Sequence, residues 1–173
     1  MLELVLGGMR SGKSLHAERL AASSGLEVHY IATAQAGDDE MRARIAQHRS
    51  RRPSGWRLHE SPLALAETIE REARQTRLLL VDCLTLWVSN QLMEAPEQLE
   101  ERSAALVAAL AAAPGRIVVV SNEVGQGGVP MNALARRFVD LSGVLHQRIA
   151  ERAERVWWVV AGLPQCLKGR PDA

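Results

Sequence analysis

The chain has few of the features that mark secreted, zinc-binding or membrane-spanning proteins. Its only cysteines, Cys83 and Cys166, lie far apart and form no ligand-spaced pair, so we expect neither a disulfide framework nor a zinc site. The longest apolar run, residues 104–113, is about half of the roughly 20 residues that a membrane span needs. The first residues lack the basic start of a signal peptide. These absences predict a cytoplasmic protein.

An excess of charge of one sign is also missing, because the formal net charge is +1. A general nucleic-acid-binding domain usually carries a large basic excess, so we expect no nucleic-acid partner. The sequence contains no N-K-x-D motif for guanine recognition. A GTPase switch of the usual kind is therefore disfavoured.

Short apolar runs alternate with helical patterns along the 173 residues. The predicted strands are 2–6, 28–32, 78–81, 117–120 and 156–160, and the predicted helices are 13–22, 38–51, 63–73, 84–93, 97–112 and 131–152, with 56–60 ambiguous. This alternation indicates an α/β fold with a mainly parallel sheet and helices on both faces. We find no internal repeat or long linker, so residues 1–173 are expected to form one domain. Ligands gather at the carboxyl ends of such strands, which directs attention to Gly7, Thr33, Asp82, Asn122 and Gly162.

Residues 7–14 match the phosphate-loop pattern G-x-x-x-x-G-K-S in full. Its glycines let backbone N–H groups turn toward phosphate oxygens, and the following helix directs its positive end at the same anions. Lys13 can reach the β- and γ-phosphates, and the Ser14 hydroxyl can ligate Mg²⁺. A chance glycine-rich turn is the alternative, but the motif lies between a predicted strand and a predicted helix, which is its required context. The sequence therefore predicts a single P-loop nucleotide-binding domain.

Asp82 follows the fully apolar run 78–81 and is a candidate for the second Mg²⁺ position, usually reached through water. The alternative is that Asp82 caps the helix predicted from Leu84. We favour the metal role, because a phosphate loop needs an acidic partner at the end of a neighbouring strand.

His48 lies on a predicted helix at i+7 from Met41, with Ile45 between them on the same face. Nearby arginines would keep its imidazole neutral, and a neutral imidazole is a nucleophile. From the residues alone, a half-buried histidine on a solvated basic helix is the more common situation. Structural or surface roles are expected for the other histidines, and core or subunit contacts for three of the tryptophans: His16, His29, His59 and His146; Trp87, Trp157 and Trp158.

Several segments beyond the phosphate loop are similar to those of one known protein family: 30–34, 38–41, 44–45, 48–49, 52–53, 56–57, 121–125, 129–130, 134–136 and Asp140. Together they resemble the bifunctional adenosylcobinamide kinase/adenosylcobinamide-phosphate guanylyltransferase family of cobalamin biosynthesis. The resemblance spans nearly the whole chain. Among the differences, Met9 replaces a common alanine, His146 replaces a common asparagine, and Gln47 stands where some members carry a second histidine.

The resemblance implies a RecA-like P-loop fold, a homotrimer and two reactions. ATP or GTP would first phosphorylate adenosylcobinamide, and GTP would then transfer GMP to that phosphate through a guanylyl-histidine, releasing pyrophosphate. His48 and Lys13 would be the catalytic residues, with Mg²⁺ held by Ser14 and Asp82. The implied nucleotide contacts are Gly7, Gly8, Met9, Arg10, Ser11, Gly12, Lys13, Ser14, Ala32, Thr33, Ala34, Arg49, Ser50, Arg51, Arg52, Glu60 and Asp82.

Two other functions remain open from the sequence. The first is another small-molecule P-loop kinase in which His48 is structural. The second is a nucleotide-gated binding module of RecA-like fold, which would need a face for a macromolecular partner.

Overall fold

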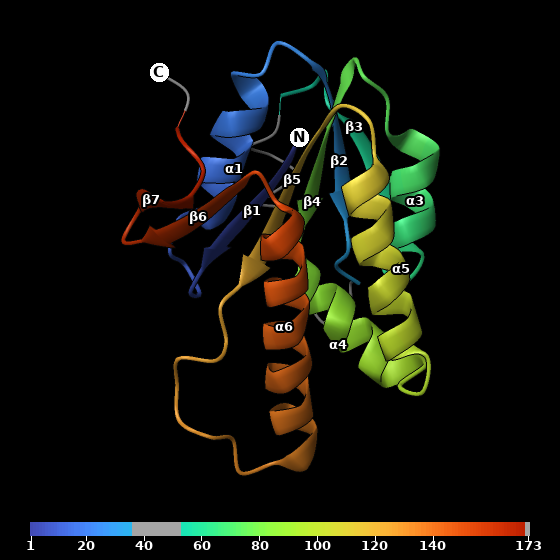
Figure 1. The fold of residues 1–173 in the computed structure, drawn as a ribbon, viewed down its shortest axis with the longest axis vertical. Coiled ribbons are helices and arrows are strands. Elements are labelled where there is room, and N and C mark those ends of the chain that lie inside the picture. The colour runs from blue at the N-terminus through green and yellow to red at the C-terminus, as the bar shows by residue number, and fades with distance from the viewer. Residues whose placement is uncertain (36–52, 172–173) are drawn as a thin grey trace.

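The computed structural model describes residues 1–35 and 53–171, and Figure 1 shows their fold. The predicted helix 38–51, which carries His48, lies outside the described residues. The strands are β1 (Leu2–Gly7), β2 (Glu27–Ala32), β3 (Arg57–Glu60), β4 (Arg77–Asp82), β5 (Arg116–Asn122), β6 (Arg155–Val160) and β7 (Leu163–Lys168). The helices are α1 (Lys13–Ala22), α3 (Leu65–Glu72), α4 (Leu84–Glu94), α5 (Leu99–Ala112) and α6 (Ala133–Arg152). None of the helices in these ranges is long and apolar enough to cross a membrane.

The seven strands form one sheet in the order β3-β2-β4-β5-β1-β6-β7. Every neighbouring pair is parallel except β6 and β7. The interior strands are buried along nearly their whole length, as expected for a parallel sheet covered on both faces. The predicted α/β class with a mainly parallel sheet is therefore confirmed.

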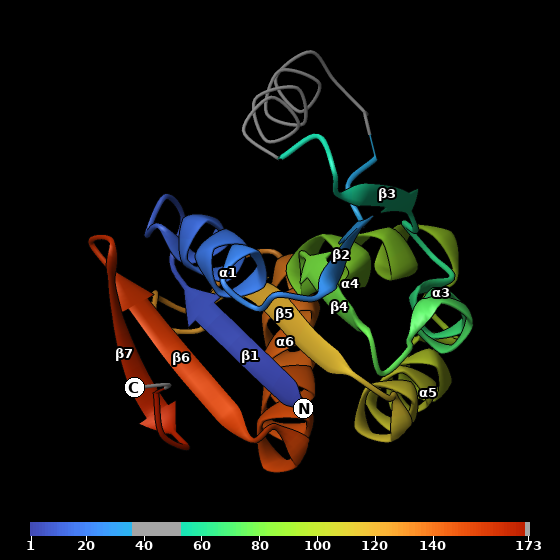
Figure 2. The same cartoon turned by 90° about the horizontal axis from the view of Figure 1, so that it is seen from above.

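Strand side chains alternate between two separate hydrophobic clusters, one on each face of the sheet. One cluster joins α3, α4, α5 and α6 to the sheet and includes Ile31, Leu79 and Val119. The other joins α1 to the opposite face and includes Val5 and Leu80. Figure 2 shows α1 and α5 on opposite sides of the sheet. Helices thus cover both faces of the sheet.

Two edge strands differ from the sequence prediction. The ambiguous stretch 56–60 contains β3, a short strand paired with β2. Strand 156–160 was predicted to be the last, but β7 follows it and pairs with it antiparallel. Ala161 and Gly162, with φ of 52° and 79°, form a two-residue turn, and positive φ at both positions is the geometry that joins tight hairpins.

A buried carboxylate links the three strands β5, β1 and β6 near their amino-terminal ends. Glu3 on β1 is fully buried, accepts hydrogen bonds from Arg116 Nε at 2.7 Å and Trp157 Nε1 at 3.0 Å, and lies 3.8 Å from Arg155 Nη1. Each partner comes from a neighbouring strand, since Glu3 is in register with Arg155 and β1 also pairs with β5. Glu3 therefore compensates two arginines and an indole N–H that the fold takes out of water.

We expect Glu3→Ala to lower the free energy of unfolding by about 3–5 kcal/mol, because it leaves buried cationic partners without their carboxylate. Urea unfolding followed by circular dichroism measures this change. Glu70→Ala, at an exposed position of α3, is the control and should change stability by less than about 0.5 kcal/mol. Equal stability of the two variants would contradict the role of Glu3.

Candidate functional site

The residues predicted to surround a ligand meet at the carboxyl edge of the sheet. Gly7 at the end of β1 is in register with Asn122 at the end of β5. Ala32 at the end of β2 is in register with Asp82 at the end of β4. The loop that follows β1 therefore lies at the same edge as the polar ends of the neighbouring strands.

The loop between β1 and α1 turns tightly through two residues with positive φ, Arg10 at 56° and Gly12 at 93°. Ser11 N donates to Gly8 O at 3.2 Å, and Ser11 O accepts from Gly162 N at 2.8 Å. The loop is thus supported from below by the turn between β6 and β7. A side chain at Gly7 would meet Val159 O at 2.6 Å, so the close approach of loop and β6 requires glycine there.

Lys13 opens α1 and is 9% exposed, with Nζ donating to Gly8 O at 3.1 Å. Burial lowers the pKa of Lys13 from its ordinary value, and the Asp82 carboxylate partly opposes that shift. The Ser11 hydroxyl is also buried, and it has no hydrogen-bond partner among the described residues. A buried ammonium, an unpaired hydroxyl and a helix N-terminus in one loop fit the oxygen atoms of a phosphate chain.

Asp82 lies at the end of β4, and its Oδ2 accepts a hydrogen bond from Tyr30 OH at 2.9 Å. Cys83, rather than Asp82, occupies the N-cap position of α4. The carboxyl group lies close enough to Lys13 to influence its pKa, as a residue that shares a metal–phosphate site must. The donor set of Ser14 hydroxyl and Asp82 carboxylate is all oxygen, which suits Mg²⁺. The metal role itself stays a prediction.

The other predicted nucleotide residues on this side have different surroundings. Thr33 is fully buried, and its hydroxyl donates to Cys83 O at 2.7 Å and accepts from Cys83 N at 2.8 Å, so it joins the ends of β2 and β4. Ala32 and Ala34 are half-buried beside it, and Glu60 is exposed at the end of β3. Their contacts with a nucleotide stay predictions. His48, Arg49, Ser50, Arg51 and Arg52 lie outside the described residues.

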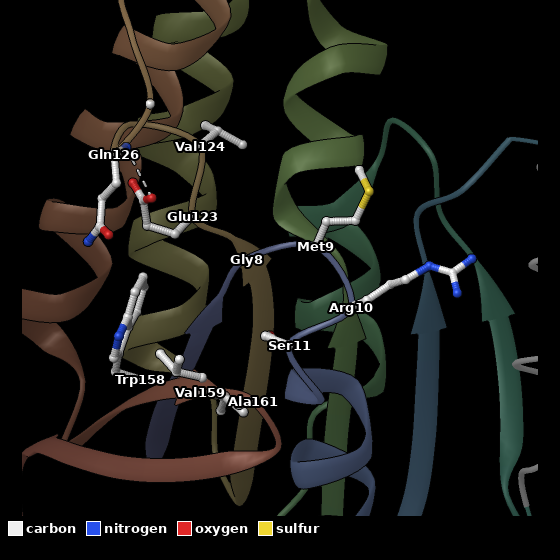
Figure 3. A pocket seen from close by; sticks show the side chains of 12 residues that line it. Gly8, Met9, Arg10, Ser11, Glu123, Val124, Gln126, Trp158, Val159 and Ala161 are labelled. Atoms are coloured by element: carbon white, nitrogen blue, oxygen red, sulfur yellow. Dashed lines mark hydrogen bonds between the residues drawn. The ribbon is translucent and has the colours of Figure 1, made fainter.

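A pocket of about 530 Å³ opens on the other side of the phosphate loop, between the loop, the end of β6 and the segment after β5. Figure 3 shows the indole of Trp158 below the carboxylate of Glu123, whereas the Arg10 side chain points away from both. Glu123 accepts hydrogen bonds from Gly125 N at 2.7 Å and Gln126 N at 3.2 Å, which fixes the segment above the pocket. Trp158 is therefore a pocket residue, and sequence reasoning missed it because it reads as part of an apolar strand.

Two hydrogen-bonded pairs of polar side chains behind the site were also not predicted from the sequence. Ser121 Oγ, at the end of β5, lies 2.7 Å from His146 Nε2 of α6, and both residues are buried. Asn122 Nδ2 donates to Thr85 Oγ1 of α4 at 3.0 Å. These pairs fasten the end of β5 to two helices. The partners are distant in the sequence, so no local pattern could have revealed them.

The family is settled by comparison with known proteins. The model of the cobinamide kinase / cobinamide phosphate guanyltransferase family matches residues 3–167. The chain is 60% identical over 172 residues to the bifunctional adenosylcobalamin biosynthesis protein CobP of Pseudomonas aeruginosa, covering 99% of both chains. This chain belongs to that family. It is also 42% identical over 182 residues to the Escherichia coli bifunctional adenosylcobalamin biosynthesis protein CobU, covering 97% of this chain and 100% of the relative.

Two solved structures have folds similar to that of this chain. The RadB recombinase is similar with a TM-score of 0.51 and 17% identity, over 91% of this chain and 73% of that one. A Pyrococcus horikoshii protein is similar with a TM-score of 0.55 and 10% identity, over 99% of this chain and 87% of that one. The predicted RecA-like P-loop fold is therefore confirmed.

We expect Gly7→Ala to destabilise the nucleotide-free protein by about 1–3 kcal/mol, because the new methyl group must displace Val159 O or the Ser11 side chain. The matched control is Gly8→Ala, where a methyl group would meet no atom within 4 Å. It should unfold within about 0.5 kcal/mol of the wild type. Thermal unfolding without ligand separates the two variants, and a Gly7→Ala protein as stable as Gly8→Ala would contradict the packing argument.

Burial lowers the pKa of His146 to about 4, and the Glu123 carboxylate only partly opposes that shift. In the unfolded chain the same imidazole takes up its proton near pH 6.5, so the unfolded state binds more protons between these values. Stability from this group is therefore complete above pH 6.5 and falls as the pH drops toward 4, by up to about 3 kcal/mol. Urea unfolding at several pH values should give a shallower acid decline for His146→Asn than for the wild type. Parallel curves would show that His146 does not stay neutral in the folded protein.

Proposed function

We propose that this chain carries out both reactions of its family. It transfers the γ-phosphate of ATP or GTP to the hydroxyl of adenosylcobinamide, and then transfers GMP from GTP to the resulting phosphate. The observation that carries the proposal is the phosphate loop of residues 7–14 placed beside Asp82, in a chain that matches the family model over residues 3–167. The proposal includes one nucleotide-binding domain formed by residues 1–173.

In the kinase step, the loop amides and Lys13 hold the β- and γ-phosphates in line with the acceptor hydroxyl. Ser14 and Asp82 would hold Mg²⁺, which neutralises charge on the phosphate oxygens when bound. Phosphoryl transfer depends mainly on positioning and charge compensation, and the buried Lys13 ammonium supplies positive charge at the phosphates. The reduced hydration of that ammonium strengthens its attraction for a phosphate oxygen.

In the guanylyl transfer, a ring nitrogen of His48 attacks the α-phosphorus of GTP. A P–N bond forms, the bond to the bridging oxygen breaks, and pyrophosphate leaves. A phosphate oxygen of adenosylcobinamide phosphate then attacks the same phosphorus, which releases His48 and gives adenosylcobinamide-GDP. Arg49, Ser50, Arg51 and Arg52 follow His48 directly and would bind phosphate oxygens, while Ala32, Ala34 and Glu60 border the nucleoside.

The same proposal includes Mg²⁺ dependence, a homotrimer and a cytoplasmic location. Exposed apolar side chains just before α6 and in its first turn support self-association: Val129 is 83% exposed, Met131 96% and Leu134 50%. Surfaces of this kind are commonly covered by a partner subunit.

We expect GTP labelled at the α-phosphate to leave acid-labile label on the wild-type protein and none on His48→Ala. The matched control is Gln47→Ala, which removes the preceding polar side chain and should keep the label.

His48→Ala should retain most of the kinase rate with adenosylcobinamide, whereas Lys13→Ala should lower both activities by about 100-fold or more. Product masses identify the phosphate and the GDP adduct.

Label that persists on His48→Ala would refute the covalent role of that residue. An unchanged kinase rate in Lys13→Ala would refute the role of the lysine. ADP formation without any covalent GMP would favour a different small-molecule kinase, and slow hydrolysis without transfer would favour a nucleotide-gated module.

A further inference from the structure

Three potential metal ligands meet at the amino-terminal end of the sheet, away from the phosphate loop. His29 on β2 lies on the same face as Ile31, because strand side chains alternate. His59 on β3 is in register with Ile31 and so joins that face. Glu72, the last residue of α3, covers both, and its backbone oxygen accepts from Arg77 at the start of β4. We call His29, His59 and Glu72 the histidine–glutamate cluster.

The ligand atoms of the histidine–glutamate cluster all lie within 4.8 Å of one another. His29 Nδ1 is 2.9 Å from His59 Nε2 and 3.7 Å from Glu72 Oε2, and His59 Nδ1 is 3.8 Å from Glu72 Oε1. Two nitrogens bound tetrahedrally at about 2.0–2.1 Å from Zn²⁺ are about 3.3 Å apart. The imidazole pair must therefore open by only about 0.4 Å, and His59 sits on the edge strand β3, where such a movement is easiest.

A second layer of contacts already orients the ligands. Glu27 Oε1 lies 3.1 Å from His29 Nε2, where it orients the ring, and His29 Nδ1 faces the cluster. Arg71 Nε donates to Glu72 Oε1 at 2.8 Å, and Arg77 Nη1 donates to Glu72 Oε2 at 3.5 Å. Both carboxylate oxygens are therefore held in place by arginines, with Oε2 3.7 Å from His29 Nδ1. A carboxylate–histidine–metal arrangement of this kind is the usual outer support of imidazole ligands.

Burial and charge decide whether an ion can enter and remain. The side chain of His29 is 1% exposed, whereas those of His59 and Glu72 are 20% and 17% exposed, so solvent reaches the open side of the cluster. Arg57, Arg71 and Arg77 lie near the carboxylates and reduce the affinity for a cation. The side chains of Arg57 and Arg71 are 66% and 61% exposed and hence largely screened, whereas that of Arg77 is 21% exposed and opposes the ion more strongly.

We propose that the histidine–glutamate cluster binds one divalent ion of the Zn²⁺ class through His29 Nδ1, His59 Nε2 and a Glu72 oxygen, with water as the fourth ligand. Imidazole nitrogens suit Zn²⁺ and Co²⁺, whereas Mg²⁺ prefers an all-oxygen site such as Ser14 and Asp82. The ion ties the edge strand β3 to β2 and α3. The absence of paired cysteines predicted no zinc site, but a set of two histidines and one carboxylate needs no cysteine.

The test uses tag-free, nucleotide-free protein in excess Mg²⁺, which occupies oxygen sites, and titrates it with Zn²⁺ or Co²⁺. We expect one equivalent of Zn²⁺ to bind and to raise the melting temperature, and Co²⁺ to give the visible absorption bands of a tetrahedral site. His59→Gln and Glu72→Gln should each weaken Zn²⁺ binding by more than about 10-fold, and Glu27→Gln by about 10-fold or more.

The matched control is Glu70→Gln, which removes an exposed carboxylate from the same helix two residues before Glu72 and should bind Zn²⁺ as the wild type does. His59 and Glu72 are partly exposed, so their variants are expected to fold, and circular dichroism verifies this before titration. Failure of the wild type to bind one equivalent would overturn the proposal and leave His29 and His59 as a hydrogen-bonded pair only. Unchanged affinity in His59→Gln and Glu72→Gln would overturn it as well.

Discussion

The close packing of the phosphate loop against β6 and the β6–β7 turn is the contact on which the site depends. Gly7 approaches the Val159 carbonyl too closely for any side chain, and Gly162 N donates to Ser11 O from beneath the loop. A loop held this way keeps its backbone N–H groups directed at the ligand before the ligand arrives. Preorganised donors of this kind bind phosphate without a large reorganisation cost.

The two ends of the sheet are held together by different chemistry. At the carboxyl end, short hydrogen-bonded pairs join neighbouring strand ends and helices: Thr33 with Cys83, Tyr30 with Asp82, and Asn122 with Thr85. At the amino end, Glu3 links three strands, and the histidine–glutamate cluster lies beside β2 and β3. At the carboxyl end, Lys13 and Asp82 are the charged side chains beside the phosphate loop, and Tyr30 donates to Asp82. Most of the ion pairs among the described residues lie at the amino end.

The interior of the fold could be predicted because a parallel sheet buries both faces of its strands. The runs 2–6, 78–81 and 117–120 are nearly all apolar, and the structure places each in the interior of the sheet. The edges could not be predicted in the same way. β7 is mostly exposed and β3 has only four residues, so neither has enough apolar character to stand out. Trp157 and Trp158 look alike in the sequence, yet one is buried against Glu3 and the other borders a pocket.

The sequence by itself determined the phosphate loop, the alternation of strands and helices, and the family, because each depends on residues close together in the chain or on a pattern of many segments. The tertiary structure decided which distant side chains meet. His29 reaches His59 because β2 and β3 pair side by side. Asp82 reaches Lys13, Ser121 reaches His146, and His29 reaches Glu72 because α1, α6 and α3 pack against the sheet. Strand order is set by the packing of whole faces, and no local pattern encodes it.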